Sequence, residues 1–246
     1  MATSTLPAPP PLFDLMAEGP LALFLDFDGT LVELAEQPDG IVVPGDLLDR
    51  LHDLRDRFDG RLAIVTGRAL DDLHRHVGAC VLARAGSHGA FCLNADGSRL
   101  GEEPAILSDE AVRAMQDFAK ERGLRFESKI YGAALHYRQH PEMEADVVQF
   151  AQGLAMQHEL ELKRGKHVVE LADSDSHKGD AVAAFMAEDG FRGARPIFIG
   201  DDLTDEDGFA GANECGGFGI AVSERERQTA RYHLANVSAV HAWLNL

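Results

Sequence analysis

The sequence is poor in cysteine and in positive charge, and it has no long apolar segment. Its three cysteines, Cys80, Cys92 and Cys215, lack the spacing of a metal site, and so few thiols indicate a reducing compartment, so we expect a cytoplasmic protein. Lys and Arg number 23 against 41 Asp and Glu, a formal net charge of −18, which disfavours nucleic acid and anionic membrane surfaces as partners. No window approaches the roughly 20 apolar residues of a membrane span.

Residues 1–11 lack what a secretory signal needs. They are rich in proline, contain no basic residue and have no apolar core. We therefore expect residues 1–18 to form a flexible N-terminal tail.

The pattern of apolar residues divides the remainder of the chain into two kinds of segment. Short apolar runs alternate with helical patterns over residues 19–103 and again over 173–246, which predicts an α/β core with a Rossmann-like, doubly wound parallel sheet. Residues 104–172 follow the order helix, two strands, helix, two strands, which predicts an inserted α+β domain with an antiparallel sheet and two helices. The core strands are expected at residues 21–27, 61–65, 80–83, 195–199 and 217–222.

Two carboxylates, one residue apart, follow the first of these strands. The run Leu21-Ala-Leu-Phe-Leu25 suits a strand that is buried on both faces of a parallel sheet. Asp26 and Asp28 then emerge at its carboxyl end, where open α/β sheets bind their ligands. Their mutual repulsion is unfavourable unless a cation lies between them or one of them carries a proton. The pair therefore indicates a metal site and a reaction.

Three further motifs should meet at the same edge of the sheet. Thr66 and Gly67 follow the second strand, Lys178 begins a helix, and a later strand ends in Gly200-Asp-Asp-Leu-Thr-Asp205. Like charges ~4 Å apart repel by about 4 kcal/mol at an effective dielectric constant near 20, so a cluster of these carboxylates needs positive charge. Mg²⁺ suits such an all-oxygen site, and Lys178 could supply a second cation. Each motif alone could be a turn or a helix cap, and their joint order carries the argument.

These four motifs, in this order, resemble those of the haloacid-dehalogenase-like (HAD) phosphohydrolases. The resemblance implies that Asp26 is the nucleophile and forms an aspartyl-phosphate. Asp28 would protonate the leaving sugar oxygen and then deprotonate the attacking water. Thr66 would hydrogen-bond a phosphoryl oxygen, and Lys178 would complete the catalytic set.

The same resemblance implies a ligand set for Mg²⁺. The metal would be held by the Asp26 side chain, the Asp28 backbone carbonyl and Asp201. Asp202 and Asp205 would lie beside the metal or orient Lys178.

Longer segments resemble the trehalose-6-phosphate phosphatases within this superfamily. They are Asp28-Gly-Thr-Leu31 with Gln37-Pro38 and Val43-Pro44 downstream, Thr66-Gly-Arg68, Gly86-Ser-His-Gly89, Glu127-Ser-Lys129, Leu135-His-Tyr-Arg138 and Gly200-Asp-Asp-Leu-Thr-Asp-Glu206. The resemblance implies a Mg²⁺-dependent phosphatase that hydrolyses trehalose 6-phosphate, with residues 104–172 as a cap that reads the disaccharide. Substrate-binding positions would be Gly67, Arg68, Ser87, His88 and Gly89 in the core, and Glu127, Lys129, Arg138, Lys166 and Glu170 in the cap.

Rival interpretations remain open at this point. A related phosphatase could act on sucrose 6-phosphate or on a glycerol glycoside phosphate, and only the cap residues speak against it. A catalytically inactive domain that binds or regulates a trehalose-phosphate synthase would tolerate loss of Asp26, Asp28 or Lys178, all of which are present. We expect a monomer that acts on a small sugar phosphate, with functional coupling to such a synthase.

Several side chains near these motifs have simpler interpretations. The charged cap residues could form surface ion pairs of little energetic value. His136 and Tyr137 are expected to pack rather than to contact substrate, and Asp71 and Asp72 are interpreted as solvated. The acidic segment with Asp173 and Asp175, just before Lys178, is unusual beside a phosphate site.

Overall fold

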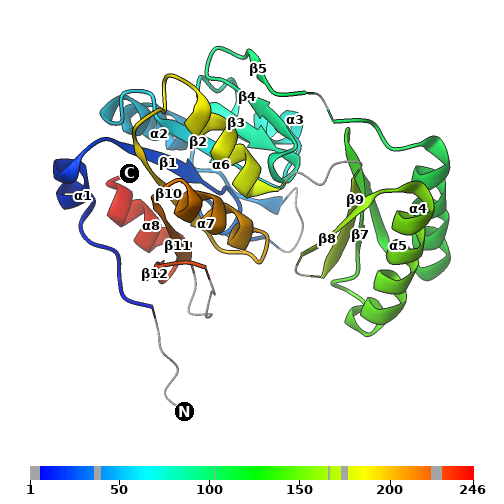
Figure 1. Ribbon diagram of the computed structural model, residues 1–246. Helices are drawn as coiled ribbons and strands as arrows, with labels where there is room; N and C mark the ends of the chain where they lie inside the picture. The colour runs from blue at the N-terminus through cyan, green and yellow to red at the C-terminus, as the bar shows by residue number, and fades with distance from the viewer. Residues whose placement is uncertain (1–5, 36–39, 103, 166, 173–176, 223–228) are drawn as a thin grey trace. The chain divides into compact units, whose positions relative to one another are not determined.

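The chain forms two compact units (Figure 1). The computed structural model describes residues 6–35, 40–102, 104–165, 167–172, 177–222 and 229–246. The first unit combines Met1–Glu102 with Ser176–Leu246, and the second consists of Glu103–Asp175. Among the described residues, no helix is both long enough and apolar enough to cross a membrane.

The first unit is built on an eight-stranded sheet with the strand order β12-β11-β10-β1-β2-β3-β4-β5. Neighbouring strands from β12 to β3 are parallel, and β4 and β5 add to the edge as antiparallel strands. Every residue of β1, β2 and β11 is buried, which is why their sequences are continuous apolar runs. The strands are β1 (Leu21–Leu25), β2 (Leu62–Val65), β3 (Ala83–Gly86), β4 (Phe91–Leu93), β5 (Arg99–Leu100), β10 (Arg195–Gly200), β11 (Phe218–Val222) and β12 (Tyr232–Leu234).

Helices cover both faces of this sheet. Leu23 and Leu25 of β1 face a core that includes apolar residues of α1, α2, α3 and α8, whereas Ala22 and Phe24 face a second core with α6 and α7. Figure 1 shows α6 and α7 side by side over the sheet. The helices are α1 (Leu12–Glu18), α2 (Leu47–Arg57), α3 (Leu70–Val77), α6 (Lys178–Ala187), α7 (Asp205–Glu214) and α8 (Val237–Leu244), with a short 3₁₀ helix η2 (Ser87–Gly89).

The central strand β1 marks a reversal in strand order. The chain passes from β1 through β2 to β3 on one side and later adds β10, β11 and β12 on the other side. The register pairs Leu25 with Ile199 of β10 and with Ile64 of β2. Open α/β sheets bind ligands at the carboxyl ends of strands where the order reverses. The residues that follow β1, β2 and β10 are therefore brought together at one edge.

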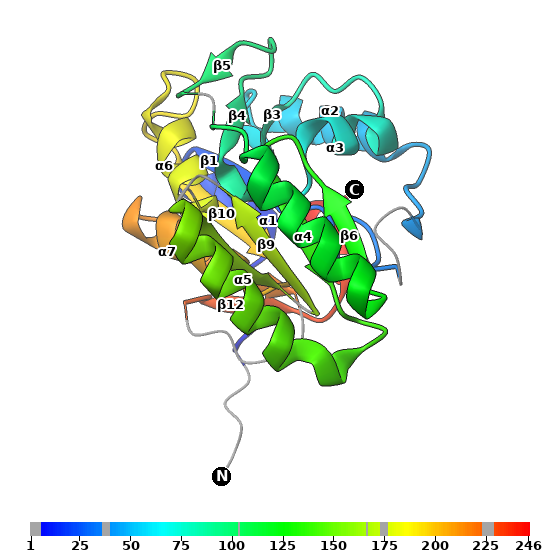
Figure 2. The ribbon, with the colours of Figure 1, turned by 90° about the vertical axis from the view of Figure 1, so that its right-hand side faces the viewer.

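The second unit is a four-stranded antiparallel sheet, in the order β6-β7-β9-β8, with two helices on one face. Figure 2 shows α4 and α5 side by side in front of this sheet. Leu135 and Val169 pack toward these helices, whereas Glu127, Ala134 and Glu170 form a cross-strand row on the alternate positions. The elements are α4 (Asp109–Arg122), β6 (Arg125–Ser128), β7 (Gly132–His136), η3 (Pro141–Met143), α5 (Glu144–His158), β8 (Glu161–Gly165) and β9 (Val168–Ala172).

These features confirm the predicted fold class, a doubly wound α/β core with an antiparallel α+β insert, and correct the predicted N-terminal tail. Residues 12–18 form α1, and Leu12 and Leu15 of this helix are buried in the core. The backbone N–H of His233 donates to the Pro7 carbonyl at 3.1 Å, and the Trp243 indole donates to the Pro10 carbonyl at 2.8 Å. The apolar stripe of α1 is too short to stand out from the prolines before it.

The third strand also differs from its predicted position. It spans Ala83–Gly86 rather than residues 80–83, because parallel pairing with β2 sets Ala63 opposite Ala83 and Val65 opposite Ala85. Val81, the most strand-favouring residue of the predicted segment, is 53% exposed. The short strand β12 was not predicted.

Candidate active site

A buried ion-pair cluster lies where β1 and β10 end. Asp26 directly follows β1, and Lys178 and Asp205 are the first residues of α6 and α7. Lys178 Nζ donates to Asp26 Oδ1 at 2.7 Å and to Asp205 Oδ1 at 2.6 Å. None of the three residues is more than 4% exposed. A lysine that bridges two buried carboxylates is the positive charge that the sequence pattern required.

A third carboxylate extends this cluster into a candidate metal site. Among the described residues, Asp26, Asp201 and Asp205 offer ligand oxygens that all lie within 4.8 Å of one another. Gly29 has a φ of +78°, and a Cβ at this position would collide with the Asp201 carboxylate. The glycine therefore allows Asp201 to approach the loop that follows Asp26. An all-oxygen donor set of this kind fits a hard divalent cation.

The electrostatics of the cluster also favour a bound cation. Burial raises the pKa of the Asp26 carboxyl well above its usual range, and although Lys178 opposes this rise, the charges of Asp205 and Asp201 add to it. Burial alone would lower the pKa of Lys178, but the charges and hydrogen bonds of Asp205 and Asp26 raise it above its usual range. Lys178 therefore stays protonated. A nucleophilic Asp26 must be ionised, and a further cation beside Asp201 would favour that form.

Asp28, the predicted acid–base group, is held by Arg68. Arg68 Nε donates to Asp28 Oδ2 at 2.6 Å, and Nη2 donates to Oδ1 at 2.7 Å. Its third nitrogen, Nη1, donates to Asp72 Oδ2 at 2.5 Å. Burial would lower the pKa of Arg68, but the hydrogen bonds and charges of Asp28 and Asp72 raise it instead. Arg68 thus contacts the acid–base residue in this structure, whereas its predicted role in binding substrate stays a prediction.

The loop after β2 packs against η2. The backbone N–H of His88 donates to the Thr66 carbonyl at 3.0 Å, and the N–H of Arg68 donates to Thr66 Oγ1 at 3.1 Å. His88 adopts a left-handed conformation, with a φ of +59°, and its ring lies where a Cβ of Gly67 would be. Ser87 is buried beside it. The structure thus gathers the predicted loop residues Thr66, Gly67, Ser87 and His88, and Gly89 ends the same 3₁₀ helix.

Asp202 and Asp205 differ in what they contact. Asp205 binds Lys178 through Oδ1, and its Oδ2 accepts a hydrogen bond from the Asp202 N–H at 2.8 Å. The Asp202 carboxylate instead accepts from the backbone N–H of Leu203 at 2.7 Å. Asp205 is therefore placed to orient Lys178, while Asp202 supports the loop before α7.

The second unit carries its own charged cluster on the row of alternate positions. Glu127 Oε2 lies 2.6 Å from His136 Nε2, and the Lys129 ammonium contacts the Glu170 carboxylate. The His136 hydrogen bond lowers the pKa of Glu127, although burial opposes this, and the charge of Lys129 contributes to the lowering. Glu127 therefore pairs with His136, and Lys129 pairs with Glu170. These four side chains are buried or half-buried, so the two pairs are not exposed surface ion pairs.

The other two predicted cap residues are Arg138 and Lys166. Arg138 lies in the turn two residues beyond β7, because that strand ends at His136. Lys166 lies outside the described residues, as do the motif residues Gln37 and Pro38 and the acidic segment with Asp173 and Asp175. Their predicted roles stay predictions.

Two residues that the sequence argument set aside have specific contacts. His136 binds Glu127, and only the strand register, which the sequence does not specify, reveals this pair. Asp72, in the first turn of α3, binds Arg68, which lies two residues before that helix, and the spacing of four residues was a signal that could have found the pair.

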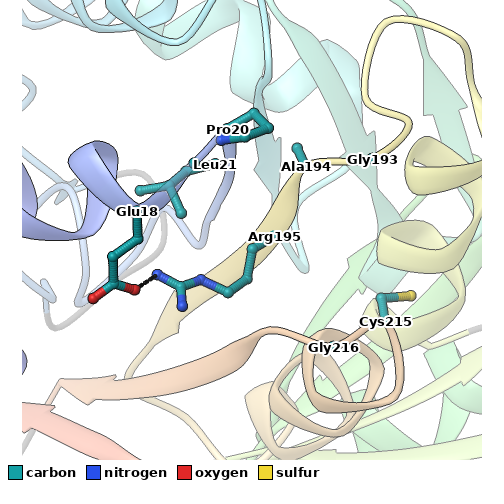
Figure 3. Close-up of a pocket in the computed structure, with 9 residues that line it drawn as sticks. Glu18, Pro20, Leu21, Gly193, Ala194, Arg195, Cys215 and Gly216 are labelled. Atoms are coloured by element: carbon teal, nitrogen blue, oxygen red, sulfur yellow. Dashed lines mark hydrogen bonds and ion pairs between the residues drawn. The ribbon is translucent and has the colours of Figure 1, made fainter.

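A separate pocket lies at the amino ends of the parallel strands of the first unit, opposite the candidate site (Figure 3). It has a volume of about 300 Å³ and lies beside the first residues of β1 and β10, Leu21 and Arg195. Arg195 pairs with Glu18 there at 2.9 Å. The amino ends of the parallel strands lie far from the carboxylate cluster, so this pocket is not part of the candidate site.

Comparison with known proteins gives a consistent picture. A family model described as trehalose-phosphatase matches residues 24–238. The trehalose-6-phosphate phosphatase of Escherichia coli (strain K12) is 38% identical over 228 residues, which cover 92% of this chain and 85% of that protein. A crystal structure of a trehalose-6-phosphate phosphatase related protein aligns with a TM-score of 0.71 at 26% identity, over 91% of this chain and 95% of that one.

The fold itself extends to more distant proteins. A sugar phosphatase of HAD subclass IIB aligns with a TM-score of 0.57 at 17% identity, over 89% of this chain and 94% of that one. This likeness shows that the two chains share a fold.

Proposed function

We propose that this chain, which belongs to the trehalose-phosphatase family, is a phosphoric monoester hydrolase. It would release phosphate from trehalose 6-phosphate. The observation that carries the proposal is the buried contact of Lys178 with Asp26, beside Asp201, at the strand ends of a HAD fold. A buried carboxylate next to a permanent cation is a fitting nucleophile for an anionic phosphoryl group.

The reaction would proceed in two balanced displacements. In the first, a carboxylate oxygen of Asp26 attacks phosphorus, the bond from phosphorus to the sugar oxygen breaks, and Asp28 gives that oxygen a proton. In the second, water attacks phosphorus, Asp28 takes its proton, and the Asp26 carboxylate leaves. The sum is one ester and one water converted to one alcohol and one phosphate.

A divalent cation, for which we propose Mg²⁺, would when bound neutralise negative charge on the phosphoryl group. The carboxylates of Asp26 and Asp201 and the backbone carbonyl of Asp28 would hold it. Asp205 belongs to the same carboxylate group, but Lys178 donates to its Oδ1 and the Asp202 N–H donates to its Oδ2, which favours an orienting role.

Other residues of the first unit would bind the phosphoryl oxygens. Lys178 offers a fixed positive charge that Asp26 and Asp205 hold in place. Thr66 Oγ1 accepts a hydrogen bond from Arg68, so its hydroxyl proton is what it can offer a phosphoryl oxygen. Ser87, His88 and Gly89 form the adjoining loop and are proposed to line the phosphate site.

Recognition of the disaccharide is proposed for the charged residues of the second unit. Glu127, Lys129 and Glu170 present both donors and acceptors, which suits sugar hydroxyls because each hydroxyl can donate and accept. Arg138 and Lys166 keep the substrate-binding roles that the resemblance implied. Mg²⁺ dependence, a monomeric cytoplasmic enzyme and coupling to a trehalose-phosphate synthase are parts of the same proposal.

Phosphate release from a panel of esters tests the proposal. Trehalose 6-phosphate, sucrose 6-phosphate and glucose 6-phosphate are each incubated with the protein, with Mg²⁺ or with a chelator. We expect Mg²⁺-dependent release that is fastest from trehalose 6-phosphate. Faster release from sucrose 6-phosphate would favour the rival enzyme, and no release from any ester would favour the regulatory domain.

A further inference from the structure

The Arg68 guanidinium binds two carboxylates, those of Asp28 and Asp72. Of these two, Asp28 belongs to the proposed catalytic set. The guanidinium holds both oxygens of Asp28, and its Nη1 donates to Asp72. The Arg68 side chain is 8% exposed and the Asp72 side chain 19% exposed. Such charge-assisted, two-pronged contacts fix the plane of a guanidinium as well as its distance.

The backbone of Arg68 is fixed as well. Its N–H donates to Thr66 Oγ1 at 3.1 Å, and its carbonyl accepts from the Ser87 N–H at 2.8 Å. The direction of the side chain beyond this anchored backbone is then set by the groups at its far end. Of the two carboxylates, Asp72 lies on a regular element, in the first turn of α3.

The Asp72 carboxylate also has partners within its own helix, Arg75 and His76. Its Oδ2 accepts from Arg68, while its Oδ1 accepts from Arg75 at 2.8 Å and lies 3.8 Å from His76 Nε2. The two oxygens therefore serve different cations, and the carboxylate cannot rotate without losing one of them.

We propose that Asp72 is a positioning residue for the reaction: it holds Arg68, and Arg68 sets the direction of the Asp28 carboxylate toward the leaving oxygen. The inference rests on the proposed acid–base role of Asp28. An acid that transfers a proton in the transition state has to lie within hydrogen-bond reach of the oxygen it protonates, so a small change in its direction slows the reaction.

A purely structural role for Asp72 makes a different prediction. A carboxylate in the first turn of a helix stabilises the helix dipole, and Asp71 in the same turn has the same charge but is exposed. If the dipole were all that mattered, Asp71→Ala and Asp72→Ala would behave alike, and all substrates would be affected equally.

The leaving group separates the two roles. An alkyl oxygen needs a proton as it departs, whereas p-nitrophenolate departs readily without one. The value of kcat/KM reports the steps up to release of the alcohol, so it is not affected by slow hydrolysis of the phosphoenzyme. We expect Asp72→Ala to lower kcat/KM for trehalose 6-phosphate roughly tenfold, a fraction of the 10²–10⁴-fold that acid–base catalysis supplies, and to change that for p-nitrophenyl phosphate far less.

Matched variants complete the experiment. Asp72→Glu keeps a carboxylate and should recover much of the activity, and Asp71→Ala should leave both substrates unaffected. In an Asp28→Asn background, Asp72→Ala should have no further effect on either substrate. Equal losses on both substrates, an equal loss in Asp71→Ala, or an undiminished loss in the Asp28→Asn background would each overturn the proposal.

A measurement that does not depend on turnover tests this inference separately from the proposed function. The urea unfolding midpoints of the wild type, Asp28→Asn, Asp72→Ala and the double variant form a cycle, and Arg68 should couple the two sites so that the shifts do not add. If the wild type released no phosphate from any ester, the proposed function would fail, while additive shifts would independently refute the link from Asp72 to Asp28. Non-additive shifts would support the link in either case.

Discussion

Lys178 donates a hydrogen bond of 2.7 Å to Asp26, although 152 residues separate them in the chain. The second unit lies entirely within this interval. The first unit therefore completes its ion-pair cluster only when its two chain segments come together. The contact connects the most informative motif of the sequence to a lysine that, by itself, looked like an ordinary helix start.

Removal of the lysine charge should destabilise the fold. In Lys178→Met, Asp26 and Asp205 remain buried without their shared cation, and breaking a buried ion pair in this way typically costs about 3–5 kcal/mol. Urea unfolding in the presence of a chelator measures the change. The control is Lys120→Met, at an exposed site of α4, which should change the free energy of unfolding by less than about 0.5 kcal/mol. Equal effects of the two substitutions would contradict the cluster.

Glu127 should contribute stability that depends on pH. Its pKa is lowered in the folded protein, mainly by the hydrogen bond with His136. A group whose folded pKa lies below its unfolded value stabilises the fold above the unfolded value, near 4.5, and this contribution is lost as the pH falls through the folded value. The difference in unfolding midpoint between the wild type and Glu127→Gln should therefore be largest above pH 5 and shrink toward pH 3. A difference that grows on acidification would have the wrong sign.

Cys92 should resist alkylation in the native protein. Burial raises the pKa of its thiol to about 12, so the reactive thiolate is scarce at pH 8. Iodoacetamide at pH 8, followed by peptide mass spectrometry, should label Cys92 only after the protein is unfolded. Labelling of native Cys92 at the rate seen in urea would show that the thiol is not enclosed as described.

Arg138 is predicted to act on the sugar rather than on the phosphoryl group. Hydrogen bonds to charged groups are worth roughly 1.5–3 kcal/mol, so Arg138→Ala should lower kcat/KM for trehalose 6-phosphate roughly ten- to hundredfold. The value for p-nitrophenyl phosphate, which lacks the sugar, should hardly change. Arg113→Ala, at an exposed site of α4, serves as the control and should affect neither substrate. Equal losses on both substrates with Arg138→Ala would argue against recognition of the disaccharide by this residue.

The positions of the core strands were predictable because burial leaves a clear pattern. A strand covered on both faces is a continuous apolar run, so β1 could be located from Leu21 to Leu25, although the expected strand of residues 21–27 extends two residues past the observed end. The rule that parallel strands share an edge then brought Asp201 to the same place without any distance information. Where the run was weaker, as in β3 with its Arg84, pairing with β2 decided the position instead.

Contacts between side chains were harder to predict, because they depend on register and on rotamers. Arg68 could have turned to solvent or to substrate, and only the fold shows that it holds Asp28, 40 residues earlier in the chain. His136 meets Glu127 because the hairpin pairs Arg125 with His136, a register that its turn sets. The burial of α1 depends on tertiary packing, for which its seven residues give little local signal.

Phosphate release from trehalose 6-phosphate by the wild type and by Asp26→Asn, measured side by side with Mg²⁺, tests the central claim most directly. Both proteins should show the same folded circular dichroism spectrum. We predict steady turnover by the wild type and a rate at least roughly 10³-fold lower for the variant, because loss of a nucleophile removes the covalent route. A variant within a few-fold of the wild type, or a wild type that releases no phosphate from trehalose 6-phosphate, would contradict it.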